Sequence, residues 1–148
     1  MNLLHNNTLG IDIGSTTVKI AVLDSEQHIL FTDYERHYAN IQETLALLLS
    51  KAKEKLGEMT VSPSITGSGG LTLSGHLNVP FTQEVVAVAT ALQDYAPQTD
   101  VAIELGGEDA KIIYFTGGID QRMNGICAGG TGSFIDQMAS LLQTDAAG

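Results

Sequence analysis

Cysteine, cationic side chains and long apolar runs are all scarce in this sequence, and each scarcity excludes something. The single cysteine, Cys127, has no partner for an intrachain disulfide, and a lone thiol fits a reducing compartment. Seventeen acidic side chains against seven Lys and Arg give a formal net charge of −10, which repels nucleic acid and anionic membranes at long range. No apolar run reaches about 18 residues, and no basic leader opens the chain. We therefore expect a cytoplasmic protein that binds neither nucleic acid nor membranes.

The first two thirds of the chain alternate strand and helix patterns. Two β-branched runs within Thr8–Asp24 flank a glycine turn, and a third run begins at His28, which predicts an antiparallel meander. Apolar residues at helical spacing predict a helix that Asn40 caps with Glu43, in a capping box, and that Gly57 ends. A short strand ending in glycines and a helix from Thr82 to Pro97 follow. This pattern predicts an α/β fold.

The pattern restarts after Asp100. Two apolar runs flank another glycine turn in VAIELGGEDAKIIYF, a short segment GGIDQRMN follows, and a helix is expected over 132–143. We therefore expect a first domain over residues 1–97 and the beginning of a second, similar domain over residues 98–148.

The two glycine turns share a motif. IDIG places Asp12 two residues before Gly14, and IELG places Glu104 two residues before Gly106. A glycine turn lets backbone N–H groups approach an anion closely, so each turn suits a phosphate group. A carboxylate beside polyphosphate is repelled unless Mg²⁺ and its waters lie between them. Asp12 and Glu104 are therefore candidate holders of Mg²⁺ through water.

Other side chains around the first turn favour the same chemistry. Ser15, Thr16 and Thr17 add hydroxyl donors, and Lys19 supplies a cation suited to a β- or γ-phosphate. The alternative is a pair of tight hairpins whose acids merely face water. No Walker A pattern occurs, because Lys111, the only lysine after a glycine run, lies in a predicted strand.

The stretch NGICAGGTGSF places Cys127 shortly before Gly130, Thr131 and Gly132, where the last helix is expected to begin. Glycines free backbone N–H groups to bond cluster sulfurs or phosphate, and a cysteine ligates iron as thiolate. The alternative is a buried, small apolar cysteine before a glycine-rich turn.

These motifs together resemble a known family. GIDIGSTTVK and ELGGEDAK resemble the two phosphate loops of the superfamily of actin, sugar kinases and heat-shock chaperones. MNGICAGGTGSFIDQMASLL resembles the cluster segment of the activators of 2-hydroxyacyl-CoA dehydratases and of ATP-dependent benzoyl-CoA reductases, the BadF/BadG/BcrA/BcrD family. The sequence departs from the usual pattern at Glu104, where the family usually has Asp, at Glu108, where many members have Gln, and in CAGG, which replaces CAAG.

The resemblance implies ribonuclease-H-like (actin-like ATPase) domains with a mixed sheet that close on ATP or ADP with Mg²⁺. It implies a homodimer sharing one 4Fe-4S cluster, with Cys127 as a ligand, and electron transfer driven by ATP hydrolysis to a dehydratase or reductase component. The residues that match nucleotide contacts in the family are Gly14, Ser15, Thr16, Thr17, Lys19, Gly106, Gly107, Asp109, Gly130, Thr131 and Gly132, with Asp12 and Glu104 as the catalytic carboxylates.

The family's second cluster cysteine and adenosine motif have no counterpart among these 148 residues. We therefore expect an N-terminal portion of a longer ATPase that has little or no activity alone. Two other functions remain open. One is a small-molecule kinase of the same superfamily, in which Cys127 only packs. The other is a nucleotide-dependent scaffold like the actin relatives.

Overall fold

The structure is a computed structural model that describes residues 7–123 and 131–145. The chain forms two compact units, Met1–Glu84 and Val85–Gly148, and each is considered by itself.

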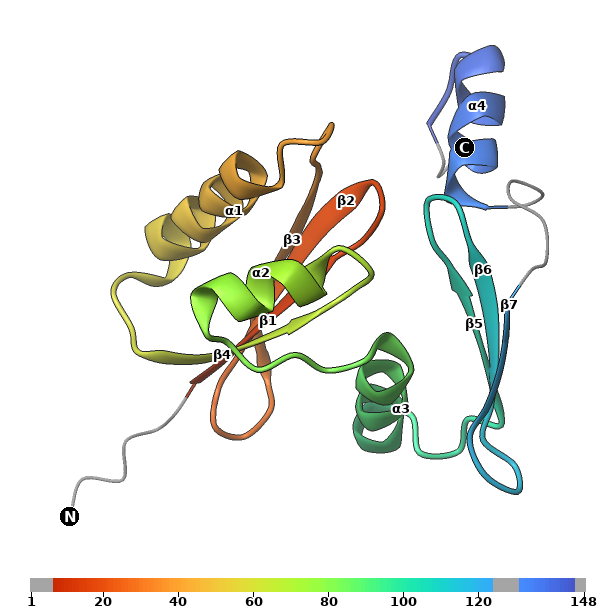
Figure 1. Ribbon diagram of the computed structural model, residues 1–148, viewed down its shortest axis with the longest axis horizontal. Helices are drawn as coiled ribbons and strands as arrows, with labels where there is room; N and C mark the ends of the chain where they lie inside the picture. The colour runs from red at the N-terminus through yellow and green to blue at the C-terminus, as the bar shows by residue number, and fades with distance from the viewer. Residues whose placement is uncertain (1–6, 124–130, 146–148) are drawn as a thin grey trace. The chain divides into compact units, whose positions relative to one another are not determined.

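The first unit is built on a four-stranded mixed sheet (Figure 1). Strands β1 (Asn7–Ile13), β2 (Thr17–Leu23) and β3 (Ile29–Arg36) form the expected antiparallel meander. Strand β4 (Val61–Thr66) pairs in parallel with β1, so the strand order is β3-β2-β1-β4. A parallel partner needs a crossover, which helix α1 (Ile41–Leu56) provides between β3 and β4.

Strand alternation separates the two faces of this sheet. Every second residue of β1, from Leu9 to Ile13, is buried, and the register pairs them with Val22, Ile20 and Val18 of β2. Helix α1 covers this face, where Leu48 and Ile13 are fully buried. Each such side chain contributes roughly 1.5–3 kcal/mol of burial energy. The core therefore fixes which residues of β1 point to the other face, and Asp12 is one of them.

The start of α1 differs from the expected capping box. The Asn40 side chain makes no hydrogen bond to the helix backbone, and its amide instead donates to the Glu43 carboxylate. The reason is local, because the Asn40 N–H already donates to the carbonyl of His37 and offers Glu43 no donor. The predicted end is confirmed, since Gly57 has φ of 79° and its N–H donates to the Lys53 carbonyl.

A helix that the sequence pattern did not predict, α2 (Gly70–Leu77), follows β4. Its two glycines and its serine have low helix propensity. Tertiary packing overrides that propensity, because Leu73 packs against the core and a Cβ on Gly70 would lie 2.7 Å from the side chain of Ile65. The close approach of α2 to β4 therefore depends on a residue that lacks a side chain.

The second unit repeats the meander. Helix α3 (Glu84–Tyr95) leads into β5 (Val101–Leu105), β6 (Ala110–Tyr114) and β7 (Asp120–Met123), which form an antiparallel sheet in the order β5-β6-β7. Helix α4 (Gly132–Leu141) follows. None of the helices in residues 7–123 and 131–145 has the length and apolar character needed to cross a bilayer.

Candidate functional site

The first glycine turn joins β1 to β2 and places an acid opposite a lysine. Asp12 and Lys19 are directly paired across the two strands, and the Lys19 Nζ lies 2.8 Å from the Asp12 Oδ2. The Gly14 N–H closes the turn by donating to the Thr17 carbonyl at 2.9 Å. Ser15 and Thr16 form the tip of the turn, so four of the predicted phosphate contacts lie on one loop beside the Asp12 carboxylate.

The second glycine turn, between β5 and β6, has the same internal geometry. Glu104 is paired with Lys111, whose Nζ lies 3.6 Å from the Glu104 Oε1, and the Gly106 N–H donates to the Asp109 carbonyl at 2.8 Å. In both hairpins the lysine follows the acid by seven residues, and the glycine N–H bonds the carbonyl three residues ahead. Gly107 and Asp109 belong to this turn. The similarity of the two motifs in sequence is therefore also a similarity of backbone hydrogen bonding.

One oxygen of each acid is buried and has no hydrogen-bond partner among the described residues. These atoms are the Asp12 Oδ1 and the Glu104 Oε2, while the other oxygen of each carboxylate faces its lysine. Leaving a buried polar atom unpaired costs about 1–3 kcal/mol, so such atoms commonly mark a bound water, ion or ligand. A carboxylate oxygen that accepts from a water on Mg²⁺ satisfies this requirement. The two candidate carboxylates therefore fit the predicted role.

Two residues at the first site escaped the sequence analysis. Thr66 is paired with Asp12 across β1 and β4, and its hydroxyl is also buried without a partner among the described residues. Gly67 follows with φ of 94°, and a Cβ there would lie 2.3 Å from the Ile13 carbonyl oxygen and 2.5 Å from the Asp12 Oδ1. Only glycine lets the chain pass so close to the carboxylate. The sequence signal was the glycine cluster after β4, which indicated only a turn.

The start of α4 is hydrogen-bonded to the second turn. The Gly132 N–H donates to the Gly106 carbonyl at 2.8 Å, and the Ser133 N–H donates to the Gly107 carbonyl at 2.9 Å. Thr131 is fully buried, and its hydroxyl has no partner among the described residues. Thr131 and Gly132 thus adjoin the second loop, whereas Cys127 and Gly130 lie outside the described residues.

A histidine that the sequence analysis did not single out, His37, is hydrogen-bonded to the first turn. His37 follows β3 and is 8% exposed, and its Nε2 lies 3.2 Å from the Gly14 carbonyl oxygen. The His37 N–H donates to the Thr16 carbonyl at 3.1 Å. The carbonyls of Gly14 and Thr16, on either side of Ser15, are therefore bonded to one residue.

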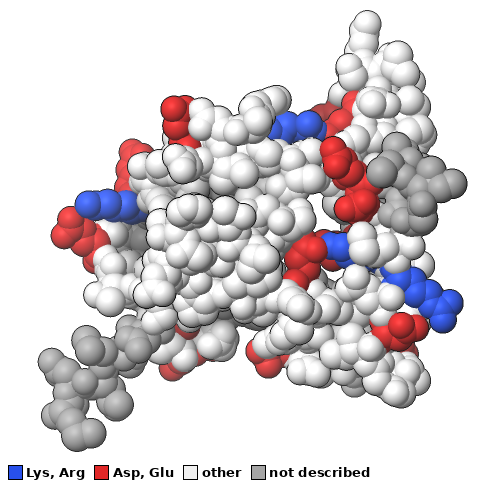
Figure 2. Space-filling view, viewed as in Figure 1, with Lys and Arg blue, Asp and Glu red and all other residues white. Residues whose placement is uncertain are grey.

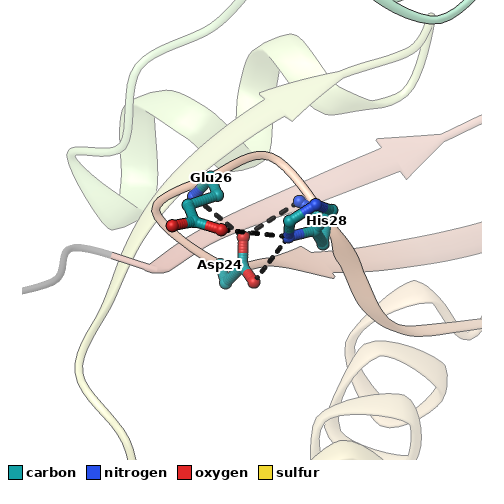
Figure 3. A network of polar contacts seen from close by, with 3 residues as sticks. All are labelled: Asp24, Glu26 and His28. Carbon is teal, nitrogen blue, oxygen red and sulfur yellow. Dashed lines mark hydrogen bonds and ion pairs between the residues drawn. The ribbon is translucent and has the colours of Figure 1, made fainter.

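A further polar cluster lies in the turn between β2 and β3, where Figure 3 shows Asp24, Glu26 and His28 close together. The Asp24 Oδ1 accepts the N–H groups of Glu26 and His28 at 2.8 and 2.9 Å. The hydrogen bond from the His28 N–H is the main cause that lowers the pKa of Asp24 below its usual 3.8. The cluster satisfies the backbone of an exposed turn, and we assign it no catalytic role.

The distribution of charge agrees with this account of local pairing. On the face in Figure 2, acidic side chains are scattered, and several Lys and Arg side chains lie beside acids. Among the described residues, no group of three or more His, Cys, Asp and Glu side chains could hold a metal ion directly. A cavity of about 380 Å³ in the first unit is lined by apolar residues such as Leu9, Leu49 and Met59, with none of the candidate site residues among its lining.

Solved structures place the chain in the class of actin-like ATPases with a ribonuclease-H-like fold. The activator of the 2-hydroxyisocaproyl-CoA dehydratase from Clostridium difficile with bound ADPNP is similar over 95% of this chain and 54% of its own, at 27% identity and a TM-score of 0.80. The predicted α/β, ribonuclease-H-like fold is thereby confirmed.

The chain belongs to the BadF/BadG/BcrA/BcrD ATPase family, whose sequence pattern matches residues 9–147. It is 30% identical over 141 residues to the (R)-2-hydroxyglutaryl-CoA dehydratase activating ATPase of Acidaminococcus fermentans, covering 92% of this chain and 54% of that protein. It is 32% identical over 144 residues to the activator of lactoyl-CoA dehydratase of Anaerotignum propionicum, covering 93% and 54%. The chain thus spans about half the length of these relatives.

Proposed function

We propose that this chain binds the phosphates of ATP or ADP with its two glycine turns and serves an ATPase that activates a CoA-ester dehydratase or reductase. The observation that carries the proposal is the repeated hairpin, in which a lysine and a glycine turn adjoin a carboxylate with one buried, unpartnered oxygen. Family membership and the bound nucleotide analogue of the Clostridium difficile relative support the same function.

Each turn has a defined part in nucleotide binding. The backbone N–H groups of the first turn, the hydroxyls of Ser15, Thr16 and Thr17 and the Lys19 ammonium bind the terminal phosphates. The turn of Gly106, Gly107 and Asp109, which belongs to the second unit, also binds phosphate. Asp12 and Glu104 would hold Mg²⁺ through water, and the bound ion would neutralise phosphate charge during hydrolysis.

The hydrogen bonds between the second turn and α4 suggest how nucleotide state reaches the cysteine segment. Any movement of the Gly106 and Gly107 carbonyls alters the partners of the Gly132 and Ser133 N–H groups. We propose that Cys127 ligates a 4Fe-4S cluster shared by a homodimer, and that this cluster supplies a low-potential electron to the dehydratase or reductase. The Gly130–Gly132 segment then links ATP state to the environment of Cys127.

Nucleotide binding is tested by following backbone amide resonances of the ¹⁵N-labelled chain during titration with Mg-ADP. We expect shifts at Ser15–Thr17 and Gly107–Asp109. Asp12→Asn removes the charge that orients Mg²⁺-bound water, so it should weaken Mg-ADP binding about tenfold or more. The weaker binding of Mg²⁺-free ADP should not fall, because the substitution releases Lys19 from its ion pair with Asp12. Glu58→Gln, at an exposed acid away from the turns, is the matched control. Equal loss in the two variants, or shifts outside the turns only, would refute the assignment.

Electron transfer is tested by anaerobic iron and sulfide analysis with electron paramagnetic resonance, on the chain and on any longer natural polypeptide that contains it. The Cys127→Ala variant and Mg-ATP are the two perturbations. A reduced-cluster signal that disappears in the variant and changes with nucleotide is expected. Iron-free protein that phosphorylates a small molecule regardless of the substitution would favour the kinase function instead.

A further inference from the structure

His37 is a buried polar residue that the proposed chemistry does not use. It lies at the end of β3, next to the first glycine turn but far from it in sequence, and only 8% of it is exposed. Buried imidazoles need partners at both ring nitrogens, so the identity of those partners defines what the ring does.

The partners of the ring define its tautomer. The Ala39 N–H donates to the His37 Nδ1 at 3.0 Å, so this nitrogen carries no hydrogen. The ring hydrogen is therefore on Nε2, which lies 3.2 Å from the Gly14 carbonyl oxygen and donates to it. His37 in this arrangement is a neutral imidazole that accepts from its own segment and donates to the glycine turn.

The chain bends sharply to make this arrangement. Tyr38 and Ala39 both have positive φ, of 44° and 66°, although neither is glycine. Each such residue costs on the order of 1 kcal/mol or more, and the bend is what turns the Ala39 N–H back toward the His37 ring. A costly backbone conformation that fixes the orientation of one imidazole indicates a functional role for the ring.

The carbonyls that His37 binds determine where the N–H groups of the turn point. The His37 ring binds the Gly14 carbonyl and the His37 N–H binds the Thr16 carbonyl, so the orientation of both carbonyls is fixed. The peptide bonds are planar and trans, so the next N–H groups, those of Ser15 and Thr17, point away from His37. The turn thereby presents these donors on the side opposite the histidine.

We propose that His37 is a positioning residue of the first phosphate loop. It holds the Gly14 and Thr16 carbonyls so that the N–H groups of Ser15 and Thr17 face the nucleotide phosphates. The inference rests on the proposed function. The second turn supports it by analogy, since its Gly106 and Gly107 carbonyls are bonded by the N–H groups of Gly132 and Ser133. Two carbonyls of each loop are thus bonded, by a histidine in the first unit and by a helix start in the second.

Two amide substitutions separate the two bonds of the ring. In His37→Gln, the side-chain N–H₂ takes the place of Nε2 and keeps the donor to Gly14. In His37→Asn, the side-chain oxygen takes the place of Nδ1 and keeps only the acceptor for Ala39. His76→Gln and His76→Asn, at an exposed histidine of α2, are matched controls. Urea unfolding of every variant reports stability independently of the loop.

The measurements are amide hydrogen exchange of Ser15–Thr17 without nucleotide and Mg-ADP affinity by amide titration. We expect His37→Asn to weaken Mg-ADP binding about three- to tenfold and to speed exchange at the turn, as loss of one neutral hydrogen bond predicts. His37→Gln should remain within about twofold of the wild type in both. Equal effects of Gln and Asn, or effects that follow only the urea midpoint, would overturn the positioning role.

The two proposals fail in different ways. A wild-type chain whose turns do not respond to Mg-ADP refutes the proposed function, whatever the exchange rates are. A wild-type chain that binds Mg-ADP, together with a His37→Asn variant that binds it equally well, refutes the role of His37 alone.

Discussion

Gly67→Ala is the substitution for which the structure predicts the largest loss of stability at the first site. Gly67 has φ of 94°, a conformation that costs an L-residue on the order of 1 kcal/mol. The added Cβ would also lie 2.3 Å from the Ile13 carbonyl oxygen and 2.6 Å from its carbon, which are backbone atoms of a central strand. Overpacking of this kind costs typically 1–3 kcal/mol. We therefore expect the free energy of unfolding to fall by about 2–4 kcal/mol.

Two other glycines separate these contributions. Gly57 has φ of 79° but no atom within 4 Å of the position of a Cβ, so Gly57→Ala should cost about 1 kcal/mol from conformation alone. Gly75 lies exposed in α2 without a close neighbour, so Gly75→Ala should gain about 0.5–1 kcal/mol of helix propensity. Urea unfolding followed by circular dichroism and by amide resonances of the first unit gives all three values. A loss in Gly67→Ala no larger than that in Gly57→Ala would show that the predicted close approach to Ile13 does not exist.

Three further predictions concern the first sheet and α4. Thr66→Val replaces a buried hydroxyl that has no partner among the described residues with a methyl group, so it should raise the free energy of unfolding by about 1 kcal/mol in urea, and a decrease would show that the hydroxyl is bonded. Lys51 lies 3.1 Å from Asp33 and 2.6 Å from Glu35, and its hydrogen bond is the main cause that lowers the pKa of Asp33. The pairing stabilises the ionised form of Asp33. Lys51→Met should therefore lower the free energy of unfolding at pH values above the usual Asp33 pKa of 3.8, and this loss should disappear as pH falls through the lowered pKa of Asp33. A difference between Lys51→Met and wild type that stays constant from about pH 6 down to about pH 2 would contradict this pairing. Leu141 and Leu142 are each 75% exposed beside Phe134 and Met138, so the chain should self-associate in sedimentation experiments and Leu142→Gln should reduce the association, whereas a monomeric wild type would contradict it.

Strand patterns and turn motifs predicted most of the first sheet, because alternation and glycine turns are local signals. The pairing of Asp12 with Lys19 follows from the hairpin register, and the seven-residue spacing repeats for Glu104 and Lys111. The sequence did not indicate α2, whose helical state depends on packing against β4 and not on propensity. The capping box was wrong because a local turn, in which the Asn40 N–H donates to the His37 carbonyl three residues earlier, leaves no backbone donor for Glu43.

The parts of the candidate site that were missed share one cause. Thr66 and Gly67 come to Asp12 through the parallel pairing of β1 with β4, and β4 is separated from β1 in the sequence by β2, β3 and α1. His37 comes to Gly14 from the end of β3. Periodicity and motif spacing report neighbours along the chain, and these three residues become neighbours only through the sheet. The functional roles of all the candidate site residues remain predictions, and Cys127 and Gly130 in addition lie outside the described residues.

The pairing of each acid with its own lysine affects how readily each loop binds a single ion. With the Lys19 ammonium 2.8 Å from the Asp12 carboxylate, the two opposite charges largely cancel, and a bare divalent cation gains little by approaching. A polyphosphate offers the ammonium a second anion, and the Lys19 side chain, which is 51% exposed, has room to turn toward it. We therefore expect the loop to bind a phosphate and a divalent cation together more readily than either ion alone. The Asp12–Lys19 ion pair would thus disfavour binding of free divalent metal ions to the loop, although the protein as a whole is strongly acidic.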